Sequence, residues 1–485
     1  RKTIRQVNAM DQKKTPLFDA LLTWKQKKPL SFHVPGHKNG TIFPEKAREI
    51  FESLLSIDAT ELSGLDDLHE AEGAIFEAQR LAAELYGSKD CYFLVGGSTV
   101  GNLAMILATC REGEVVFVQR NSHKSVMNAL ELAGARPIFI TPEYDKEVDR
   151  VSVISPQTIQ QAIEQHPSAK AVVLTYPDYF GSTYPLEKIT AICHEKNIPV
   201  LVDEAHGAHF KLGAPFPKSA IDCGADIVVQ SAHKTLPALT MGSYLHICSD
   251  RVSEKKVARF LQMVQTSSPS YLVMASLDLA RYFMATRTRE HLEKSFDQIR
   301  HIRQRLSRLE NVSVQPIREG LDDPFKITLV SDSIDLHDLS SQFESHGIFP
   351  EMVQNNQLLL IHGFHQDRYD YTRLERAIKS INTLKKRPFH GKIKRLPIGQ
   401  AIHRLEISYE ELHHLETEWV EWSHAIGQLS AETVIPYPPG IPLIVKGERI
   451  REEDVRLLTS KEQHFQSIQY DGQNLQQGIL IIVER

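Results

Sequence analysis

The feature that most constrains the fold is a regular alternation of two hydrophobic patterns between residues 92 and 230. Short apolar runs rich in β-branched residues recur at 92–95, 114–118, 137–140, 171–175, 198–202 and 227–230. Between the first five lie stretches with helical spacing of apolar residues, at 100–110, 124–133, 156–165 and 186–196. Short buried strands separated by amphipathic helices are typical of a parallel sheet covered on both faces. The sequence therefore predicts an α/β fold with a mostly parallel central sheet.

The regions on either side of this segment have different patterns. The start of the chain reads as an irregular arm with one amphipathic helix near residues 18–25, and helical spacing returns from about 254 to 309, with a break at 266–271. After residue 311, strand-like and helical stretches are mixed, at 325–330, 334–346, 357–361 and 372–385. The parts that we expect are an arm over 1–65, a large domain over 66–310 and a smaller α+β region over 311–485.

Composition excludes several classes of protein. The 56 Lys+Arg against 61 Asp+Glu give a net charge of −5, so there is no electrostatic reason to expect a nucleic-acid partner. No run approaches the roughly 18 apolar residues that a membrane span needs, and the polar first residues lack the apolar stretch of a secretory signal. The five cysteines contain no CxxC pair, which is typical of free thiols in a reducing cytoplasm.

The residues after each strand are the candidates for chemistry, because ligands of a wound parallel sheet bind outside the carboxyl ends of its strands. The first strand is followed by Gly96-Gly97-Ser98-Thr99 and then by a helix. Two glycines allow close backbone approach, and the free N–H groups of a helix N-terminus favour a phosphate. A tight turn with an ordinary helix cap would explain the same residues without a ligand.

Later strand ends bring further polar side chains to the same predicted edge. His123 follows the second strand at a helix start, where a capping turn is the alternative. Asp203 ends the fifth strand, and a buried carboxylate there needs a charged partner such as a pyridinium nitrogen or a metal. Ala205 faces the same side and leaves room for a flat ring. Lys234 follows the sixth strand and is either a solvated loop lysine or a buried nucleophilic amine.

These features together match pyridoxal 5′-phosphate (PLP), which has a phosphate, a flat ring, a basic ring nitrogen and an aldehyde. The chain resembles the fold-type-I PLP enzymes, and specifically the Orn/Lys/Arg decarboxylase family. The matching segments cover most of the chain: FHVPGHK at 32–38, LDDLH at 65–69, RNSHKS at 120–125, DEAHG at 203–207, SAHK at 231–234 and IPYPPGIP at 435–442.

The resemblance implies a role for each matching residue. Lys234 is expected to bind the cofactor's aldehyde, Asp203 to pair with the ring nitrogen, and His123 and Ala205 to cover the two faces of the ring. His233 or Lys234 is expected to return a proton to the substrate. The residues expected at the phosphate are Ser98, Thr99, Ser231, His233 and, towards a neighbouring subunit, Ser267 and Ser268. The family also implies at least a homodimer, with 32–37 and 65–69 lining its interface.

Two departures from the family pattern change these expectations. Many relatives read Asn-Pro-Thr after the fourth strand, whereas this chain reads Tyr176-Pro177-Asp178-Tyr179. The contact to the cofactor's phenolic oxygen is therefore expected from Thr175 or His206. About 31 residues precede the first matching segment, so the decamer that larger relatives build through an N-terminal wing domain is not expected.

The implied reaction is the decarboxylation of a basic amino acid for polyamine metabolism. Arginine is favoured as the substrate, as a route to agmatine, and lysine and ornithine are the alternatives. The acidic residues considered as partners of the substrate's basic side chain are Glu61, Asp66, Asp67 and Glu432. For each of these four, an ordinary structural carboxylate is the alternative.

Other functions remain open at this point. An aminotransferase or a side-chain lyase would share the fold, and Arg318 or Arg368 could clamp the α-carboxylate that an aminotransferase needs to hold. A metal-dependent hydrolase could use the histidine pairs 33/37 and 206/209, whose spacing zinc sites also show. That function would leave Lys234 unexplained, so no metal is expected. A non-catalytic PLP-binding protein is the last alternative, which the intact Lys/Asp/His set disfavours.

Overall fold

The computed structural model describes residues 9–354, 356–383, 400–412, 414–437, 440–459, 467–470, 475 and 477–483. Within this part of the chain, eight strands form a central sheet in the order β1-β9-β8-β7-β6-β2-β3-β14. The chain divides into two compact units, and the strand β7 (Val200–Asp203) runs from the second unit into the first.

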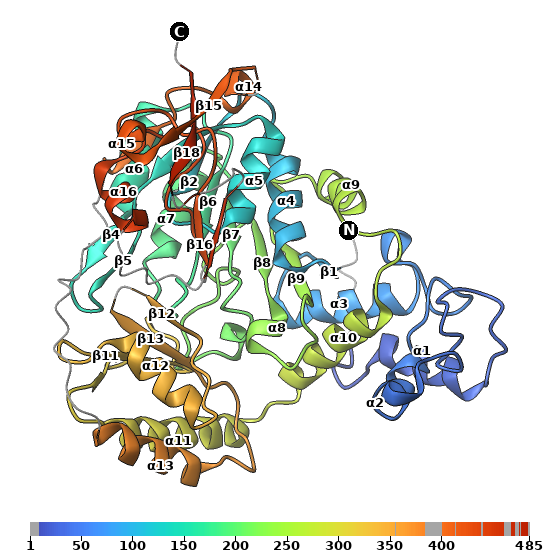
Figure 1. Cartoon of the computed structure of the whole chain (residues 1–485). Coiled ribbons are helices and arrows are strands. Elements are labelled where there is room, and N and C mark those ends of the chain that lie inside the picture. Colours follow the sequence, from blue (N-terminus) through green and yellow to red (C-terminus); the bar gives the residue numbers. More distant parts are fainter. Residues whose placement is uncertain are drawn as a thin grey trace, which may run out of the picture. The chain divides into compact units, whose positions relative to one another are not determined.

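The first unit comprises Arg1–Ala108, Val202–Leu212 and Ser219–Arg287. Its helices and strands are α1 (Pro16–Gln26), α2 (Glu45–Leu55), η1 (Leu68–Glu70), α3 (Ala74–Tyr86), β1 (Asp90–Leu94), α4 (Gly97–Thr109, which ends one residue beyond the unit), η2 (Phe210–Leu212), β8 (Ile227–Gln230), α8 (Ala232–Thr235), β9 (Ser243–Ile247), α9 (Glu254–Val264) and α10 (Tyr271–Ala285). The strand β9 pairs antiparallel with both β1 and β8. Helices α1, α3 and α10 pack against one another (Figure 1).

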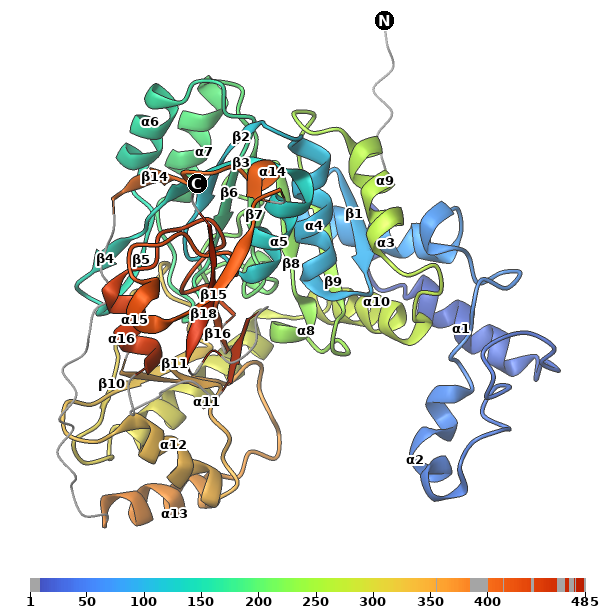
Figure 2. The ribbon, with the colours of Figure 1, turned by 45° about the horizontal axis from the view of Figure 1, so that its top comes forward.

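The second unit comprises Thr109–Leu201, Gly213–Lys218 and Thr288–Arg485. Its earlier elements are β2 (Val115–Gln119), α5 (Lys124–Ala133), β3 (Arg136–Ile140), β4 (Glu143–Asp145), β5 (Arg150–Val153), α6 (Pro156–Gln165), β6 (Val172–Thr175), α7 (Leu186–Glu195) and α11 (Arg289–Leu306). The strand β2 pairs in parallel with β3 and β6. Helices α6 and α7 pack together, as Figure 2 shows.

The later elements of the second unit form smaller sheets and one further strand of the central sheet. They are β10 (Ser313–Val314), β11 (Lys326–Val330), α12 (Leu336–Ser345), β12 (Met352–Gln354), β13 (Gln357–Ile361), α13 (Tyr371–Asn382), β14 (Ile402–Arg404), α14 (Tyr409–Leu412), β15 (Thr417–Glu421), α15 (Trp422–Ala425), β16 (Ile435–Tyr437), α16 (Glu452–Thr459), β17 (Ser467–Gln469) and β18 (Gly478–Ile482). The order β10-β11-β13-β12 forms a four-stranded antiparallel sheet with α12 packed on it. The strand β14 pairs antiparallel with β3.

The α/β prediction is confirmed, with one correction to the sheet. Helices α5 and α6 and strands β8 and β13 lie where the hydrophobic pattern predicts them. The central sheet is mixed, because β9 and β14 are antiparallel strands that the prediction did not include. Helix α2 in the arm was also missed, since its residues are mostly exposed and its single buried residue is Leu55. No helix of the described ranges is long and apolar enough to cross a membrane.

A buried ion pair fastens the start of the chain to α10. Arg281 and Asp278 both have fully buried side chains and lie 2.8 Å apart. The Arg281 guanidinium also donates to the carbonyl of Gln12, and Asp278 accepts from the backbone N–H of Leu17 at the start of α1. The arm is therefore attached to the first unit by polar contacts that water does not screen.

Candidate active site

The loop between β1 and α4 has the geometry of an anion cradle. It leaves the sheet after Leu94, and α4 begins at Gly97, so the N-terminus of a 13-residue helix faces the end of the strand. The helix can approach the sheet because Gly101 has no side chain; a methyl group there would lie 2.7 Å from Val229 Cγ1 and 2.8 Å from Leu94 Cδ1. Ser98 in the first turn of α4 accepts a hydrogen bond of 2.8 Å from Ser231, which follows β8. The two predicted phosphate-binding segments therefore meet.

Asp203 is buried at the end of β7 and is held by hydrogen bonds. Its Oδ2 accepts from the side-chain amide of Asn102 at 2.9 Å, and its Oδ1 accepts from the backbone N–H of Ala205 at 3.2 Å. Asp203 is 3% exposed and Asn102 is fully buried. Sequence reasoning missed Asn102, although an amide inside the otherwise apolar stretch 100–108 of α4 was a signal for it. The arrangement fixes a carboxylate where the prediction expects a partner for a ring nitrogen.

Lys234 lies next to His206 in the same unit. The distance from Lys234 Nζ to His206 Nε2 is 3.2 Å, which brings together the loops after β7 and β8. His206 is 5% exposed, and Lys234 is half-buried, which is less buried than the sequence suggested. Since His206 contacts the amine, it is positioned to influence the group that the resemblance assigns to cofactor attachment.

His233, the residue before Lys234, is oriented by a backbone carbonyl. Its Nδ1 lies 3.1 Å from the carbonyl oxygen of Gly242, so Nδ1 carries the proton and donates it to that bond. Burial lowers the pKa of His233 below its ordinary value; the bond to Gly242 opposes this shift, and the charge of Lys234 adds to it. His233 is therefore favoured in its neutral form.

Glu204 follows Asp203 but belongs to a different set of contacts. Its carboxylate accepts from Gln230 at 2.7 Å and from the backbone N–H of Ala220 at 2.6 Å. Complete burial raises its pKa to about 8, although these hydrogen bonds act in the opposite direction. Gln230 in turn accepts from His246 at 3.1 Å. Glu204 thus anchors the strand that carries Asp203 through a separate buried polar chain.

The segment that contains Ser267 and Ser268 is exposed and lies beside the LDDLH segment. His69 Nε2 donates to the Thr266 carbonyl at 2.9 Å, and the Tyr271 hydroxyl donates to the Asp66 carbonyl. Gln265, just before this segment, accepts from the backbone N–H of Val95 at the end of β1. Two segments that the resemblance assigns to a subunit interface are therefore brought together in one chain. Thr99 is also exposed.

Asp66 is used as a structural carboxylate. Its side chain accepts hydrogen bonds from backbone N–H groups between Asp67 and Phe76, so it caps the N-terminal end of α3. Partial burial alone would raise the Asp66 pKa, but these hydrogen bonds outweigh burial and lower it. Asp67 caps η1 through the His69 N–H. Both carboxylates thus follow the structural alternative; Glu61 is exposed and Glu432 accepts from the Leu480 N–H.

His123 and Thr175 lie in the second unit, where each is held by its neighbours. His123 caps α5, because its Nδ1 accepts from the backbone N–H of Ser125 at 3.2 Å. Thr175 ends β6, and its hydroxyl donates to Ser122 at 3.3 Å. The turns after β2 and β6 are therefore joined directly.

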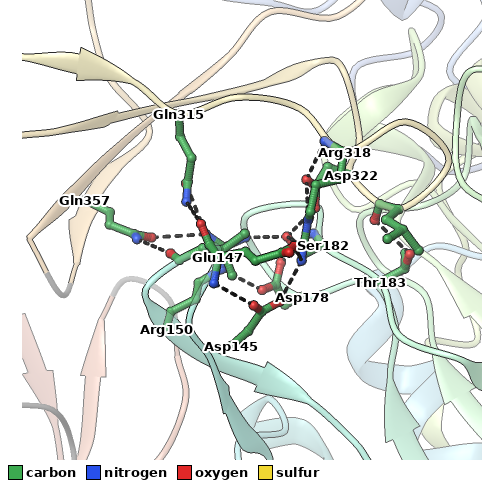
Figure 3. Close-up of polar contacts among 12 residues, drawn as sticks. Asp145, Glu147, Arg150, Asp178, Ser182, Thr183, Gln315, Arg318, Asp322 and Gln357 are labelled. Carbon is green, nitrogen blue, oxygen red and sulfur yellow. Dashed lines mark hydrogen bonds and ion pairs between the residues drawn. The ribbon is translucent and has the colours of Figure 1, made fainter.

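The Tyr-Pro-Asp-Tyr segment is locked by a polar network around two arginines of the second unit (Figure 3). Arg150 Nε donates to Asp178 at 2.9 Å, and Asp178 Oδ1 accepts from the backbone N–H of Ser182 at 2.8 Å. Ser182 donates to Asp322 at 2.7 Å, which is paired with Arg318. The departure from the family pattern therefore has a structural use in this chain.

Arg318 is engaged by carboxylates of its own unit. It pairs with Asp322 at 2.8 Å and with Asp145 at 2.7 Å (Figure 3). The hydrogen bonds that Arg318 donates to Asp322 and Asp145 raise its pKa further above its already high ordinary value, although burial acts in the opposite direction. A guanidinium shared by these groups is not available as a carboxylate clamp. Arg368, the other candidate, is exposed.

The histidines considered for zinc binding do not belong to a cluster of three or more possible metal ligands among the described residues. Across the described residues, no cluster of three or more His, Cys, Asp or Glu side chains could hold a metal ion. His37 pairs with Asp58 at 3.2 Å, and His33 packs edge-on against Trp24. The cysteines are free thiols.

Comparison with known families decides the identity of the chain. The model of the Orn/Lys/Arg decarboxylase major domain matches residues 15–321, and that of the C-terminal domain of the same family matches residues 392–468. The chain belongs to the Orn/Lys/Arg decarboxylase family. The prediction of a decarboxylase acting on basic amino acids is confirmed at this level.

Individual relatives agree with the assignment. An uncharacterized protein, YaaO, of Bacillus subtilis is 45% identical over 92% of this chain and 94% of its own length. An arginine decarboxylase of B. subtilis is 35% identical over 92% of this chain and 93% of its own length. Among solved structures, the lysine decarboxylase LdcF of Francisella novicida matches with a TM-score of 0.80 at 19% identity, covering 97% of this chain and 81% of its own. That likeness confirms the fold.

Proposed function

We propose that this chain is a PLP-dependent arginine decarboxylase that releases CO₂ and agmatine. The observation that carries the proposal is the set of groups gathered in the first unit: a buried carboxylate, Asp203, fixed by Asn102, and an amine, Lys234, beside His206. The Ser98–Ser231 pair adds hydroxyls at the N-terminus of α4. This donor set fits the ring nitrogen, the aldehyde and the phosphate of PLP, respectively.

In this mechanism the chain's own residues bind the cofactor, orient it and transfer one proton to the substrate. Bound PLP would supply the conjugated ring that takes up the electron pair left when CO₂ departs. Asp203 would keep a proton at the ring nitrogen, and Asn102 would hold the carboxylate in place for that purpose. The Cα–carboxylate bond breaks, CO₂ leaves, and a proton takes its place at Cα.

Lys234 is the better candidate for the group that returns this proton. The Nδ1–H of His233 donates to the Gly242 carbonyl, so this proton is not available to the substrate. Burial also lowers the pKa of His233, so the protonated imidazolium that could act as an acid is disfavoured near neutral pH. Lys234 remains a proton carrier next to His206. We therefore assign His233 to orienting its own turn and contacting the phosphate.

The other predicted contacts complete the proposal. His123 and Ala205 would cover the faces of the ring, and Thr175 or His206 would contact the phenolic oxygen, as the family resemblance implies. Ser98, Thr99 and Ser231 would hold the phosphate, with Ser267 and Ser268 exposed towards a second subunit. The free cysteines are consistent with the proposed location in a reducing cytoplasm.

The arm supports the proposed homodimer. Large apolar side chains are exposed along residues 30–54, and the most exposed include Phe32 at 89% and Ile50 at 75%. Monomeric soluble proteins rarely leave such a group of side chains uncovered. A second copy of the chain is the occupant that the family implies. Sedimentation should give a dimer, whereas a monomer at micromolar concentration would contradict this part of the proposal.

Arginine is proposed as the substrate because four relatives named arginine decarboxylase are 33–35% identical over at least 90% of this chain. The relatives at 22% identity include both an inducible lysine decarboxylase and a biodegradative arginine decarboxylase, so the more similar relatives carry the argument. The test is to incubate PLP-loaded protein with arginine, lysine or ornithine and to quantify CO₂ and the amine. We expect agmatine from arginine and none from Lys234→Ala. Cadaverine as the main product would identify lysine as the substrate, and putrescine would identify ornithine. A keto acid without CO₂ would indicate an aminotransferase.

A further inference from the structure

The turn that carries His123 is held by the C-terminal part of the second unit. This turn connects β2 to α5, and its imidazole caps the helix. Because His123 Nδ1 accepts the N–H of Ser125, that nitrogen carries no proton, and the ring hydrogen of the neutral imidazole lies on Nε2. Nδ1 is therefore engaged in this hydrogen bond. Further contacts that fix the side chain are expected at the opposite edge of the ring, which carries Cδ2 and Nε2.

Gly440 of the Pro-rich segment lies against that edge. Its carbonyl accepts a 2.9 Å hydrogen bond from the backbone N–H of Lys124, the residue after His123. Gly440 is buried and has φ of +85°, and a methyl group on it would lie 3.1 Å from both Cδ2 and Nε2 of His123. Such a distance is shorter than an ordinary van der Waals contact, so the ring or the segment would have to move. The missing side chain at residue 440 thus makes room for the imidazole.

An ion pair fixes the segment that contains Gly440. Arg120, three residues before His123, donates from Nε and Nη2 to the two carboxylate oxygens of Glu448 at 2.7 and 2.6 Å. The same guanidinium donates to the carbonyls of Pro442 and Leu443 at 2.9 and 3.1 Å. These guanidinium hydrogen bonds all reach residues that follow Gly440, and the guanidinium also lies over the ring of Phe139, 5.8 Å from its centroid. A two-point arginine–carboxylate pair of this kind sets both distance and orientation.

Glu448 also contacts two other residues of the second unit, His403 and Val445. His403 in β14 contacts Glu448 at 3.2 Å, and the Val445 N–H donates to it at 3.0 Å. Burial alone would raise its pKa, but the charge of Arg120 and hydrogen bonds from His403 and Arg120 outweigh burial and hold the pKa at about 2. Glu448 is therefore ionised throughout the physiological range, and the pair with Arg120 persists.

The same segment also reaches the far end of α5. Lys446 donates to Glu131, in the last turn of this helix, at 2.6 Å. Gly440 contacts the first turn and Lys446 the last, so the C-terminal segment spans the whole length of α5. A backbone hydrogen bond at the first turn and a partly exposed ion pair at the last turn therefore attach this segment to both ends of α5.

We infer that residues 440–448 are a positioning element for the His123 imidazole, with Gly440 and the Arg120–Glu448 pair as its working parts. This inference rests on the proposed function, in which His123 covers one face of the PLP ring. Arg120, Gly440 and Glu448 are positioning residues that act through His123. A shift of the imidazole by a few tenths of an ångström would change ring packing without removing any group that contacts the substrate.

The first test compares Gly440→Ala with Gly427→Ala in the cofactor-free full-length protein. Gly427 has φ of +83° and no atom within 4 Å of an added methyl group, so both variants have the same backbone strain and only one crowds His123. The readout is the ¹⁵N NMR spectrum of protein that contains ¹⁵N-labelled histidine. The His123→Gln variant assigns the His123 signal, because that signal is absent from its spectrum. We expect the His123 ring signals to shift in Gly440→Ala alone. Unchanged signals in both variants, or equal shifts, would overturn the inference.

The second test uses the loaded enzyme. We expect Gly440→Ala to raise the dissociation constant of PLP and to lower kcat for arginine, each by about tenfold, with less than a twofold effect in Gly427→Ala. If wild-type protein turns over and both variants match it, the positioning role is wrong. If wild-type protein forms no amine from arginine, lysine or ornithine, the proposed function is wrong. The histidine spectra of the first test would still show whether Gly440 positions the His123 ring.

A second pair of variants covers the case in which Gly440→Ala does not fold. Arg120→Lys keeps the charge but loses the two-point pair with Glu448. Arg449→Lys is the matched control, because Arg449 forms the same kind of pair with Glu406 on the surface of the same unit. We expect the His123 signals and PLP affinity to change in Arg120→Lys only. The same response in both variants, or none in Arg120→Lys, would contradict the inference.

Discussion

The contact between Asn102 and Asp203 can be measured without cofactor or substrate. Asn102→Ala removes the 2.9 Å hydrogen bond to a carboxylate that is 3% exposed. A hydrogen bond to a charged group contributes about 1.5–3 kcal/mol, and a buried carboxylate that loses it has no water to replace it. We therefore expect the free energy of unfolding of the cofactor-free protein to fall by about that amount.

A double-mutant cycle isolates this interaction from other effects of the substitutions. The single variants Asn102→Ala and Asp203→Ala are compared with the double variant by urea unfolding, and the coupling energy should be about 1.5–3 kcal/mol. Asn128→Ala is the matched control, because Asn128 is exposed within α5 and its substitution changes helix propensity alone. A coupling energy below about 0.5 kcal/mol would show that Asn102 does not hold Asp203.

Three further predictions concern other contacts. Arg281→Met leaves Asp278 buried without its partner, so the free energy of unfolding should fall by about 3–5 kcal/mol; a loss under about 1 kcal/mol would contradict the buried pair. Asp66→Asn removes a carboxylate with a lowered pKa, whose stabilisation is present above the unfolded-state pKa and is lost as pH falls through the folded-state pKa. Urea unfolding should show a deficit of about 1 kcal/mol at neutral pH that vanishes in acid, and a deficit independent of pH would refute this cause. Arg318→Lys should leave KM for arginine within about twofold, whereas a large rise in KM would restore Arg318 as a carboxylate clamp.

The sequence was sufficient for the elements whose hydrophobic pattern is strong and local. Helix α5 and strand β8 begin and end where the pattern predicts. The strand β9 was missed because Ser243, Tyr244 and His246 interrupt the apolar run, and its burial comes from pairing with β1 and β8 on either side. Antiparallel pairing between distant segments leaves no periodic signal of its own.

The site shows the same limit. Asp203, Lys234 and Ser231 could be proposed as candidate site residues because each comes at or after the end of a strand, and the fold places such residues at one edge. Asn102 and Gly440 could not be assigned roles, because their contacts are with residues 101 and 317 positions away in sequence. Arg318 and Asp66 are charged residues in suggestive places, and only their partners reveal that both are structural.

The most direct test of the central claim is to locate the lysine that binds PLP. Protein loaded with PLP is reduced with borohydride, which makes the lysine–cofactor bond permanent, and its peptides are analysed by mass spectrometry. The account predicts a phosphopyridoxyl group on Lys234 and an unmodified Lys234→Ala protein under the same conditions. Modification of a different lysine, or equal labelling of the variant, would contradict the assignment of the active site.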